Sequence, residues 1–205
     1  MIKSTIEGLF PIPIYRTKIN RNLTKKELLF VDKNKINCNT NYGNNSSLNT
    51  NVLDEKIFEK LKNELNLIIQ DYFEKVISPA DNITPYITQS WLNYTKKNQY
   101  HHKHSHPNSL VSGIFYIDCN EEFDKIKFFN ESYDTIEFTF KNWNLWNSKS
   151  WWFSVKTGDI ILFPSSLEHM VENKEGNNTR ISLAFNVFIK GVIGAKNTVT
   201  ELVLK

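Results

Sequence analysis

The sequence predicts a mostly β protein with flanking helices, built as a double-stranded β-helix (jelly roll) with N-terminal helices packed on one sheet. From residue 84 onward, short segments rich in Ile, Phe, Val, Tyr and Trp alternate with turn residues. Before residue 84 the apolar residues follow a helical period instead. Eight strands after a helical part are typical of a jelly roll braced by helices. We therefore expect a single domain over 1–205, with a strand and helices in 1–83 and the jelly-roll core in 84–190.

The N-terminal part should begin with an edge strand and a short helix. Two prolines interrupt the apolar segment 10–18, which confines a strand there to a sheet edge or to its own first residues. Thr24 and Glu27 have the spacing of a capping box, which predicts a helix running to about residue 31. Residues 34–52 are polar and rich in Asn, so we expect a loop.

A long helix is predicted from about residue 54 to residue 77, where Ser78-Pro79 ends it. Its apolar side chains recur every three or four residues and form one stripe to bury, made of Ile57, Leu61, Leu65, Ile68, Tyr72 and Val76. The strands expected after it are 85–95, 110–118, 125–129, 134–140, 151–155, 159–163, 168–172 and 179–189.

The composition excludes several classes of partner. Lys and Arg number 25 against 22 Asp and Glu, and a net charge of +3 gives no strong signal for nucleic acid or a membrane surface. No window has the roughly 20 apolar residues of a membrane helix, and the N-terminus does not read as a signal peptide.

The two cysteines, Cys38 and Cys119, are far apart and suit free thiols in a reducing compartment. We therefore expect a cytoplasmic protein.

The five histidines lie in two places, four of them within residues 101–106 and the fifth at His169. His104 and His106 are two residues apart, so in an extended strand both imidazoles point to one side. In a jelly roll His169 can lie across the barrel from this pair. Three protein ligands that leave other positions open are typical of a catalytic metal site. The alternative is a solvated His-rich loop with an unrelated His169. His101 and His102 are expected to be exposed or to support the ligands, without binding the metal.

The residues after His169 suggest a second kind of binding group. Arg180 and Ser182 lie in the strand-like run RISLAFNVFI and share a face. A guanidinium beside a hydroxyl is a carboxylate-binding pair. A buried Arg among apolar neighbours needs an anionic partner, which a bound carboxylate supplies. The alternative is an Arg in a surface ion pair.

Taken in order, these segments resemble the 2-oxoglutarate and Fe(II)-dependent oxygenase superfamily, in particular small 2-oxoglutarate oxygenases of bacteria and marine phages. The resemblance covers nearly the whole chain. It rests on Leu9-Phe10-Pro11-Ile12-Pro13 with Tyr15, Trp91-Leu92-Asn93, His104-Ser105-His106-Pro107, Ser112-Gly113-Ile114-Phe115-Tyr116, Gly158-Asp159 through Phe163-Pro164-Ser165, His169, Arg180-Ile181-Ser182 and Phe185-Asn186.

The resemblance implies a role for each matching position. His104, His106 and His169 would hold Fe(II), and Arg180 and Ser182 would bind the distal carboxylate of 2-oxoglutarate. An Asn eleven residues before the first metal histidine contacts 2-oxoglutarate in the nucleic-acid demethylase branch, and Asn93 has that spacing. Tyr116 is a further candidate for the cosubstrate pocket. The alternatives are that Asn93 caps a turn and that Tyr116 belongs to the core.

The implied activity is a dioxygenase that uses O2 and 2-oxoglutarate to hydroxylate a substrate, with release of succinate and CO2. The superfamily usually has HxD or HxE where this chain has HxH, so the ligand set is neutral and could also suit Zn or Ni. The alternative is a cupin-type metal protein without 2-oxoglutarate, in which Arg180 and Ser182 have no role. A third possibility is a non-enzymatic binding jelly roll.

Neither the substrate nor the oligomeric state follows from the sequence. Residues 138–153 hold four of the five tryptophans. They are expected either to cover the mouth of the barrel and bind an apolar or planar substrate, or to pack on the outer sheet or in a homodimer interface.

Overall fold

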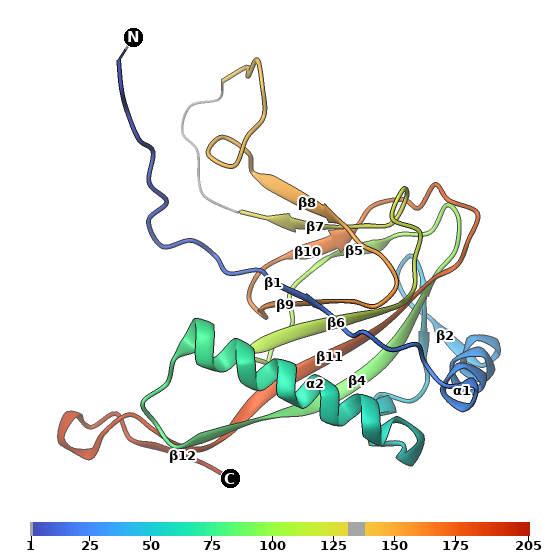
Figure 1. Cartoon of the computed structure of the whole chain (residues 1–205), viewed down its shortest axis with the longest axis horizontal. Coiled ribbons are helices and arrows are strands. Elements are labelled where there is room, and N and C mark those ends of the chain that lie inside the picture. The colour runs from blue at the N-terminus through green and yellow to red at the C-terminus, as the bar shows by residue number, and fades with distance from the viewer. Residues whose placement is uncertain (1, 131–137) are drawn as a thin grey trace.

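The computed structural model describes residues 2–130 and 138–205, which form two antiparallel β-sheets with helices on the outside (Figure 1). The strands of the larger sheet are β1 (Tyr15–Lys18), β2 (Cys38–Thr40), β3 (Asn45–Ser47), β4 (Ile83–Thr95), β6 (Val111–Asp118), β9 (Asp159–Pro164), β11 (Arg180–Ile193) and β12 (Leu202–Leu204). The smaller sheet contains β5 (His101–His104), β7 (Lys125–Phe129), β8 (Ser150–Ser154) and β10 (His169–Val171).

Strands β4 to β11 divide between the two sheets in the manner of a double-stranded β-helix. The larger sheet has the order β1-β9-β6-β11-β4-β3-β2, with β12 added to β11, and the smaller has the order β5-β10-β7-β8. Strands β4, β6, β9 and β11 thus face strands β5, β7, β8 and β10. The predicted fold class is confirmed.

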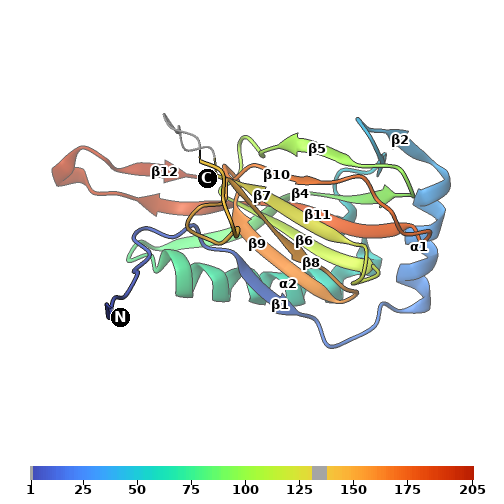
Figure 2. The same cartoon turned by 90° about the horizontal axis from the view of Figure 1, so that it is seen from above.

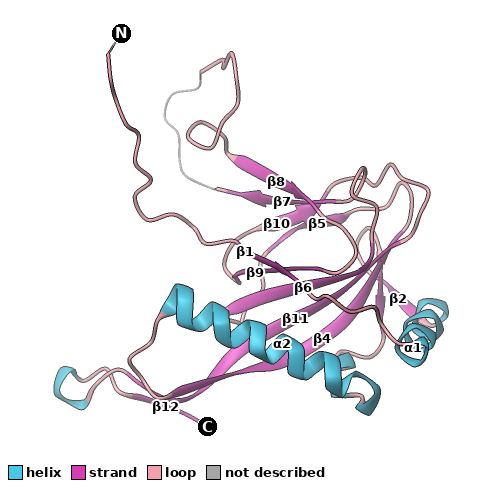
Figure 3. Ribbon diagram, in the orientation of Figure 1, coloured by secondary structure: helices cyan, strands magenta, loops and turns pink. Residues whose placement is uncertain are grey.

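The helices brace the larger sheet on its outer side. Helix α2 (Glu59–Tyr72) lies along this sheet, whereas the smaller sheet lies on the sheet's other side (Figures 2 and 3). The buried side chains of α2 are Leu61, Leu65, Ile69 and Tyr72, which confirms the predicted stripe in its central part. Helix α1 (Lys25–Ile36) begins with the predicted capping box, in which the Thr24 side chain accepts from the backbone of Glu27. No helix of the described residues is long and apolar enough to cross a membrane.

Strand β11 separates two environments. Its residues Ile181, Leu183, Phe185 and Val187 belong to the apolar core beneath the helices. The alternating residues Arg180, Ser182 and Ala184 instead line a cavity on the face toward the smaller sheet. A second, smaller apolar cluster includes Ile126, Phe128 and Phe163. One strand therefore builds the core with one face and presents polar groups with the other.

Several predicted boundaries differ from the structure. Residues 10–14 are irregular and only β1 is extended, while α1 continues to residue 36. The segment 34–52 is not simply a loop, because it contains the short hairpin β2–β3. The long helix is split into 3-10 turns at Val52–Asp54 and Lys56–Phe58, α2, and a π turn at Phe73–Ile77. A further 3-10 turn, Lys196–Thr198, precedes β12.

The eight core strands include one that the sequence pattern missed. Residues 138–140 are not a strand, and 134–137 lie outside the described residues. The eighth strand is β5, which is short and composed of HHKH, so it has no apolar alternation to reveal it.

Gly113 of β6 provides a test of the packing beneath the helices. A Cβ at this position would lie 2.1 Å from the ring of Phe185 and 2.8 Å from the side chain of Leu162. Gly113→Ala should therefore lower the free energy of unfolding by about 1–3 kcal/mol through overpacking, as measured by urea denaturation. Gly8→Ala is the matched control, because a Cβ there meets nothing closer than 3.6 Å. Equal stability of the two variants would mean that β6 and β11 are spaced differently.

Candidate metal centre

The seven residues singled out in the sequence line one cavity between the two sheets. They are Asn93, His104, His106, Tyr116, His169, Arg180 and Ser182. The strand register explains why they meet. Ser182 pairs with Asn93 on one side and with Tyr116 on the other, so β4, β11 and β6 present three polar side chains in a row. His104 pairs with His169 across β5 and β10 on the facing sheet.

The three predicted metal ligands converge on one point. Ligand nitrogens of His104, His106 and His169 all lie within 4.8 Å of one another. The Nε2 atoms of His104 and His106 are 3.1 Å apart. Two nitrogens that each bind one metal ion at about 2.1 Å, with a right angle between the bonds, would also be about 3 Å apart. The spacing therefore suits a shared cation.

The hydrogen bonds of the three rings fix which nitrogen is free. Nδ1 of His104 donates to the carbonyl oxygen of His102 at 2.7 Å, and Nδ1 of His169 donates to that of Leu167 at 3.2 Å. A carbonyl oxygen can only accept, so each Nδ1 carries the proton and each Nε2 keeps its lone pair. Metal-binding histidines are commonly oriented in this way.

His106 is held by two side chains instead of by a carbonyl group. Its Nδ1 donates to Oδ1 of Asn186 at 2.7 Å, and Oγ of Ser112 lies 2.9 Å from the same nitrogen. Asn186 and Ser112 are paired in the β11–β6 register, which places both beneath the ring. The Nε2 lone pairs of His104 and His106 therefore face each other at 3.1 Å. That arrangement is repulsive unless a cation or a proton lies between them.

Burial keeps these imidazoles neutral. His169 is 5% exposed, and its ring packs against Phe163 with centroids 4.7 Å apart. Burial, followed by the neighbouring imidazoles, lowers the pKa of His169 to about 3. Burial likewise lowers the pKa of His106 to about 4 and that of His104 below its usual value. Neutral imidazole is the form that ligates a metal.

Arg180 is a buried cation without a carboxylate partner among the described residues. It is 3% exposed, its Nε has no hydrogen-bond partner, and its Nη1 donates only a long 3.4 Å bond to the carbonyl oxygen of Lys125. The buried carboxylate of Asp124 is already taken by Lys174 at 2.9 Å. A buried charge in this state is costly unless an anion pairs with it.

Two other side chains of the cavity can form hydrogen bonds with a polar ligand. Oδ1 of Asn93 is buried and has no hydrogen-bond partner in the described part of the chain, so it can accept a bond from a ligand. Burial raises the pKa of Tyr116 above its ordinary value, so its hydroxyl stays a potential donor. Ser182 lies between them in the register.

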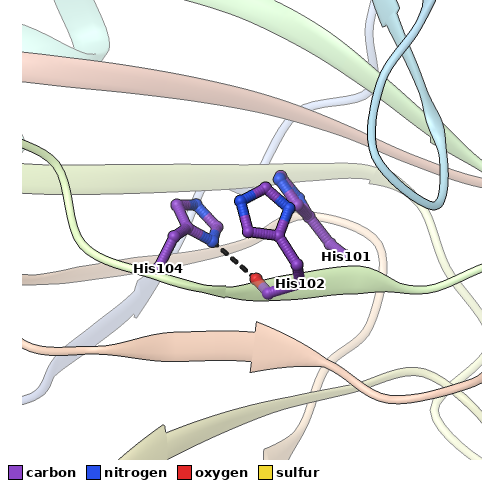
Figure 4. A group of neighbouring side chains, drawn as sticks. All are labelled: His101, His102 and His104. Carbon is purple, nitrogen blue, oxygen red and sulfur yellow. Dashed lines mark hydrogen bonds between the residues drawn. The ribbon is translucent and has the colours of Figure 1, made fainter.

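The other two histidines are not exposed, which corrects the favoured expectation. His101 and His102 are half-buried, and with His104 they form a second group of ligand nitrogens within 4.8 Å (Figure 4). His101 also lines the cavity. No Asp or Glu among the described residues joins either histidine group.

The Trp-rich segment does not line this cavity. Its aromatic side chains border a separate hollow of about 440 Å³ beside β7 and β8, formed mainly by Phe138, Phe140, Trp143, Trp151 and Trp152. These side chains are partly to largely exposed. Among the tryptophans, only Trp91 lies at the cavity, where its ring is 5.6 Å from that of His106.

Asn186, Ser112 and His101 were not among the predicted site residues. Asn186 shares the face of Arg180 and Ser182 through the same two-residue period, so alternation along RISLAFN could have indicated it. Ser112 has the corresponding relation to Tyr116. Nothing in the pattern of HHKH indicates that His101 turns toward the cavity.

Comparison with known proteins gives a consistent result. A family model described as "Putative 2OG-Fe(II) oxygenase" matches residues 89–186. No curated protein sequence matches the chain significantly.

Solved structures share the fold at low sequence identity. A prolyl-4-hydroxylase from Pseudomonas putida has a TM-score of 0.58 and 9% identity, covering 85% of this chain and 92% of its own. A 2OG-Fe(II) oxygenase family oxidoreductase from Burkholderia pseudomallei has a TM-score of 0.54 and 12% identity, covering 84% and 83%. HygX from Streptomyces hygroscopicus, solved with nickel, 2-oxoglutarate and hygromycin B, has a TM-score of 0.55 and 11% identity, covering 86% and 82%.

The family model matches the part of the chain that contains the three converging histidines, Arg180 and Ser182. Together with the shared double-stranded β-helix fold, this match agrees with the resemblance to 2OG-Fe(II) oxygenases drawn from the sequence.

Proposed function

We propose that this protein is an Fe(II)- and 2-oxoglutarate-dependent dioxygenase that hydroxylates a substrate and releases succinate and CO2. One observation carries the proposal. Three imidazoles with free Nε2 atoms converge in the same cavity as a buried Arg180 that lacks a carboxylate partner among the described residues. The first feature suits a divalent metal, and the second suits a ligand with a carboxylate.

His104, His106 and His169 would hold the metal through Nε2. Three protein ligands leave other coordination positions open, as catalytic sites require. When bound, iron and 2-oxoglutarate together supply the oxygen activation that no protein side chain can provide. The contribution of the chain is to fix the three imidazoles through their Nδ1–H groups and to exclude water with Phe163, Trp91 and their neighbours.

Arg180 would bind the distal carboxylate of 2-oxoglutarate, with Ser182 beside it. The guanidinium is planar and permanently charged, so it can give two parallel hydrogen bonds to a carboxylate. Its unpaired Nε and the unpaired Oδ1 of Asn93 are buried polar groups of this pocket that the described residues do not satisfy.

The cavity between the lining side chains has a volume of about 30 Å³. That volume holds one or two water molecules, whereas 2-oxoglutarate is several times larger. Binding therefore requires some lining side chains to rotate outward.

Because the three ligands are neutral, the metal that occupies the site should depend on which metal ions are available. A site of three imidazoles offers no negative charge, so Zn and Ni can compete with Fe(II) for it. The alternative function, a cupin-type metal protein without 2-oxoglutarate, would use the same histidines but would leave the buried charge of Arg180 unexplained.

Anaerobic titration separates these functions. With Fe(II) bound, added 2-oxoglutarate should produce a weak visible charge-transfer band, and it should also increase the retention of iron on a desalting column. Admission of air should yield succinate. The triple variant His104→Asn/His106→Asn/His169→Asn is the control, and it should show neither the band, nor the retained iron, nor the succinate. Metal binding by the wild type without the band or succinate would support the cupin-type alternative.

Arg180→Ala should weaken 2-oxoglutarate binding by about tenfold to a hundredfold, because a charge-assisted hydrogen-bonded pair contributes about 1.5–3 kcal/mol. Isothermal titration of the metal-loaded protein measures this, and metal content should be unchanged. Arg180→Lys keeps the positive charge but loses the two parallel N–H donors of the guanidinium. Its affinity for 2-oxoglutarate should lie between those of the wild type and Arg180→Ala. Arg16→Ala, on the exposed edge strand β1, is the control. Loss of metal from Arg180→Ala would show a structural role instead.

Without metal, the protein should lose stability as the pH falls from 7 to 5. The folded-state pKa values of His106 and His169 lie below the unfolded value of 6.5, so below 6.5 the unfolded chain binds more protons. Each such histidine then costs about 1.4 kcal/mol per pH unit. Urea denaturation in the presence of a chelator measures the slope. The double variant His106→Asn/His169→Asn should have a shallower slope, and an identical slope would contradict the assignment of these pKa values.

A further inference from the structure

The β5–β10 pairing contains an irregularity that changes the direction of one histidine. His104 pairs with His169 and His101 pairs with Val171, so β5 has one residue more than β10 between these two pairs. Regular alternation from His104 would turn His102 toward the cavity and His101 away from it. An extra residue of this kind re-aims the side chains next to it, and it is His101 that lines the cavity.

His101 lies beside the metal ligands without joining them. Its ring stacks on that of His104, with centroids 4.4 Å apart and an angle of 23° between the planes. The converging nitrogens at the candidate metal position come from His104, His106 and His169, and His101 belongs only to the other group. Nδ1 of His104 already donates a hydrogen bond to the carbonyl oxygen of His102, which is the dashed line in Figure 4. A second ion on His101, His102 and His104 would have to break that bond or compete for Nε2.

The neighbours of His101 indicate which of its ring nitrogens can donate a hydrogen bond. The amide Nδ2 of Asn41 lies 3.5 Å from its Nε2. If this amide donates, Nε2 is the acceptor and Nδ1 carries the proton. His101 and Arg180 line the same cavity, and no carboxylate of the described residues lines it.

We infer that His101 is a fourth histidine of the centre, which donates a hydrogen bond to bound 2-oxoglutarate beside Arg180 and does not bind the metal. This inference rests on the proposed function. It assigns to a residue of β5, on the smaller sheet, a role complementary to that of Arg180 and Ser182 on β11. The cosubstrate would then be held from both sheets.

His101→Phe tests the inference, because phenylalanine keeps a ring for stacking on His104 and removes both nitrogens. We expect unchanged metal content, at one ion per chain, and a dissociation constant for 2-oxoglutarate raised about tenfold or more. Anaerobic isothermal titration of the Fe(II)-loaded protein measures the affinity, and elemental analysis measures the metal. His101→Gln, which restores a donor, should recover part of the affinity.

His102→Phe is the matched control, since His102 is the neighbouring histidine and does not line the cavity. It should bind 2-oxoglutarate like the wild type. Wild-type affinity in His101→Phe would overturn the inference and leave the proposed function intact. Loss of the bound ion from His101→Phe would also overturn the inference. The same holds if the wild type binds a second ion that both His101→Phe and His102→Phe lose. A wild type that binds metal without 2-oxoglutarate would overturn the proposed function itself.

Discussion

The site depends on the antiparallel pairing of β11 with β4 and β6. This pairing fixes which residues of β11 face the helices and which face the smaller sheet. Arg180 and Ser182 point into the cavity because Ile181 and Leu183 point into the apolar core. A shift of one residue would exchange the two sets and bury a guanidinium among leucines and phenylalanines. The hydrophobic core therefore specifies the register, and the register places the polar groups.

The same register explains how the chain accommodates His106 at the position where the superfamily that it resembles usually has a carboxylate. Asn186 and Ser112 are paired neighbours on β11 and β6, and both contact Nδ1 of His106. Oδ1 of Asn186 requires a donor, which an imidazole N–H provides and an ionised carboxylate does not. Asn186 and Ser112 therefore suit a histidine at position 106.

Much of this arrangement could be predicted because it depends on periodic patterns. The two-residue period of the long strands and the three-to-four-residue period of α2 predicted the fold class. Residue spacing indicated His104, His106, His169, Arg180 and Ser182, whereas Asn93 and Tyr116 came from the family resemblance, and all seven line one cavity. The unpredicted parts depend on local interactions that have no period. Strand β5 is held by its neighbour β10 and has no apolar pattern of its own, and the β2–β3 hairpin consists of polar residues. The direction of His101 follows from one extra residue, which no alternation rule can anticipate.

Charge balance links the metal and the cosubstrate in the proposed complex. The three imidazoles are neutral, and no carboxylate of the described residues joins them, so a divalent ion would keep its full charge. Arg180 adds a further buried positive charge with no carboxylate partner in the described chain. A ligand with two negative charges would offset most of this total, whereas in an HxD site the protein supplies one of those charges. Each of the two, metal and dianion, should therefore strengthen the binding of the other, and thermodynamic reciprocity requires the two effects to be equal. The absence of a ligating carboxylate in this part of the chain makes the dianion a more important partner of the metal than it would be in an HxD centre.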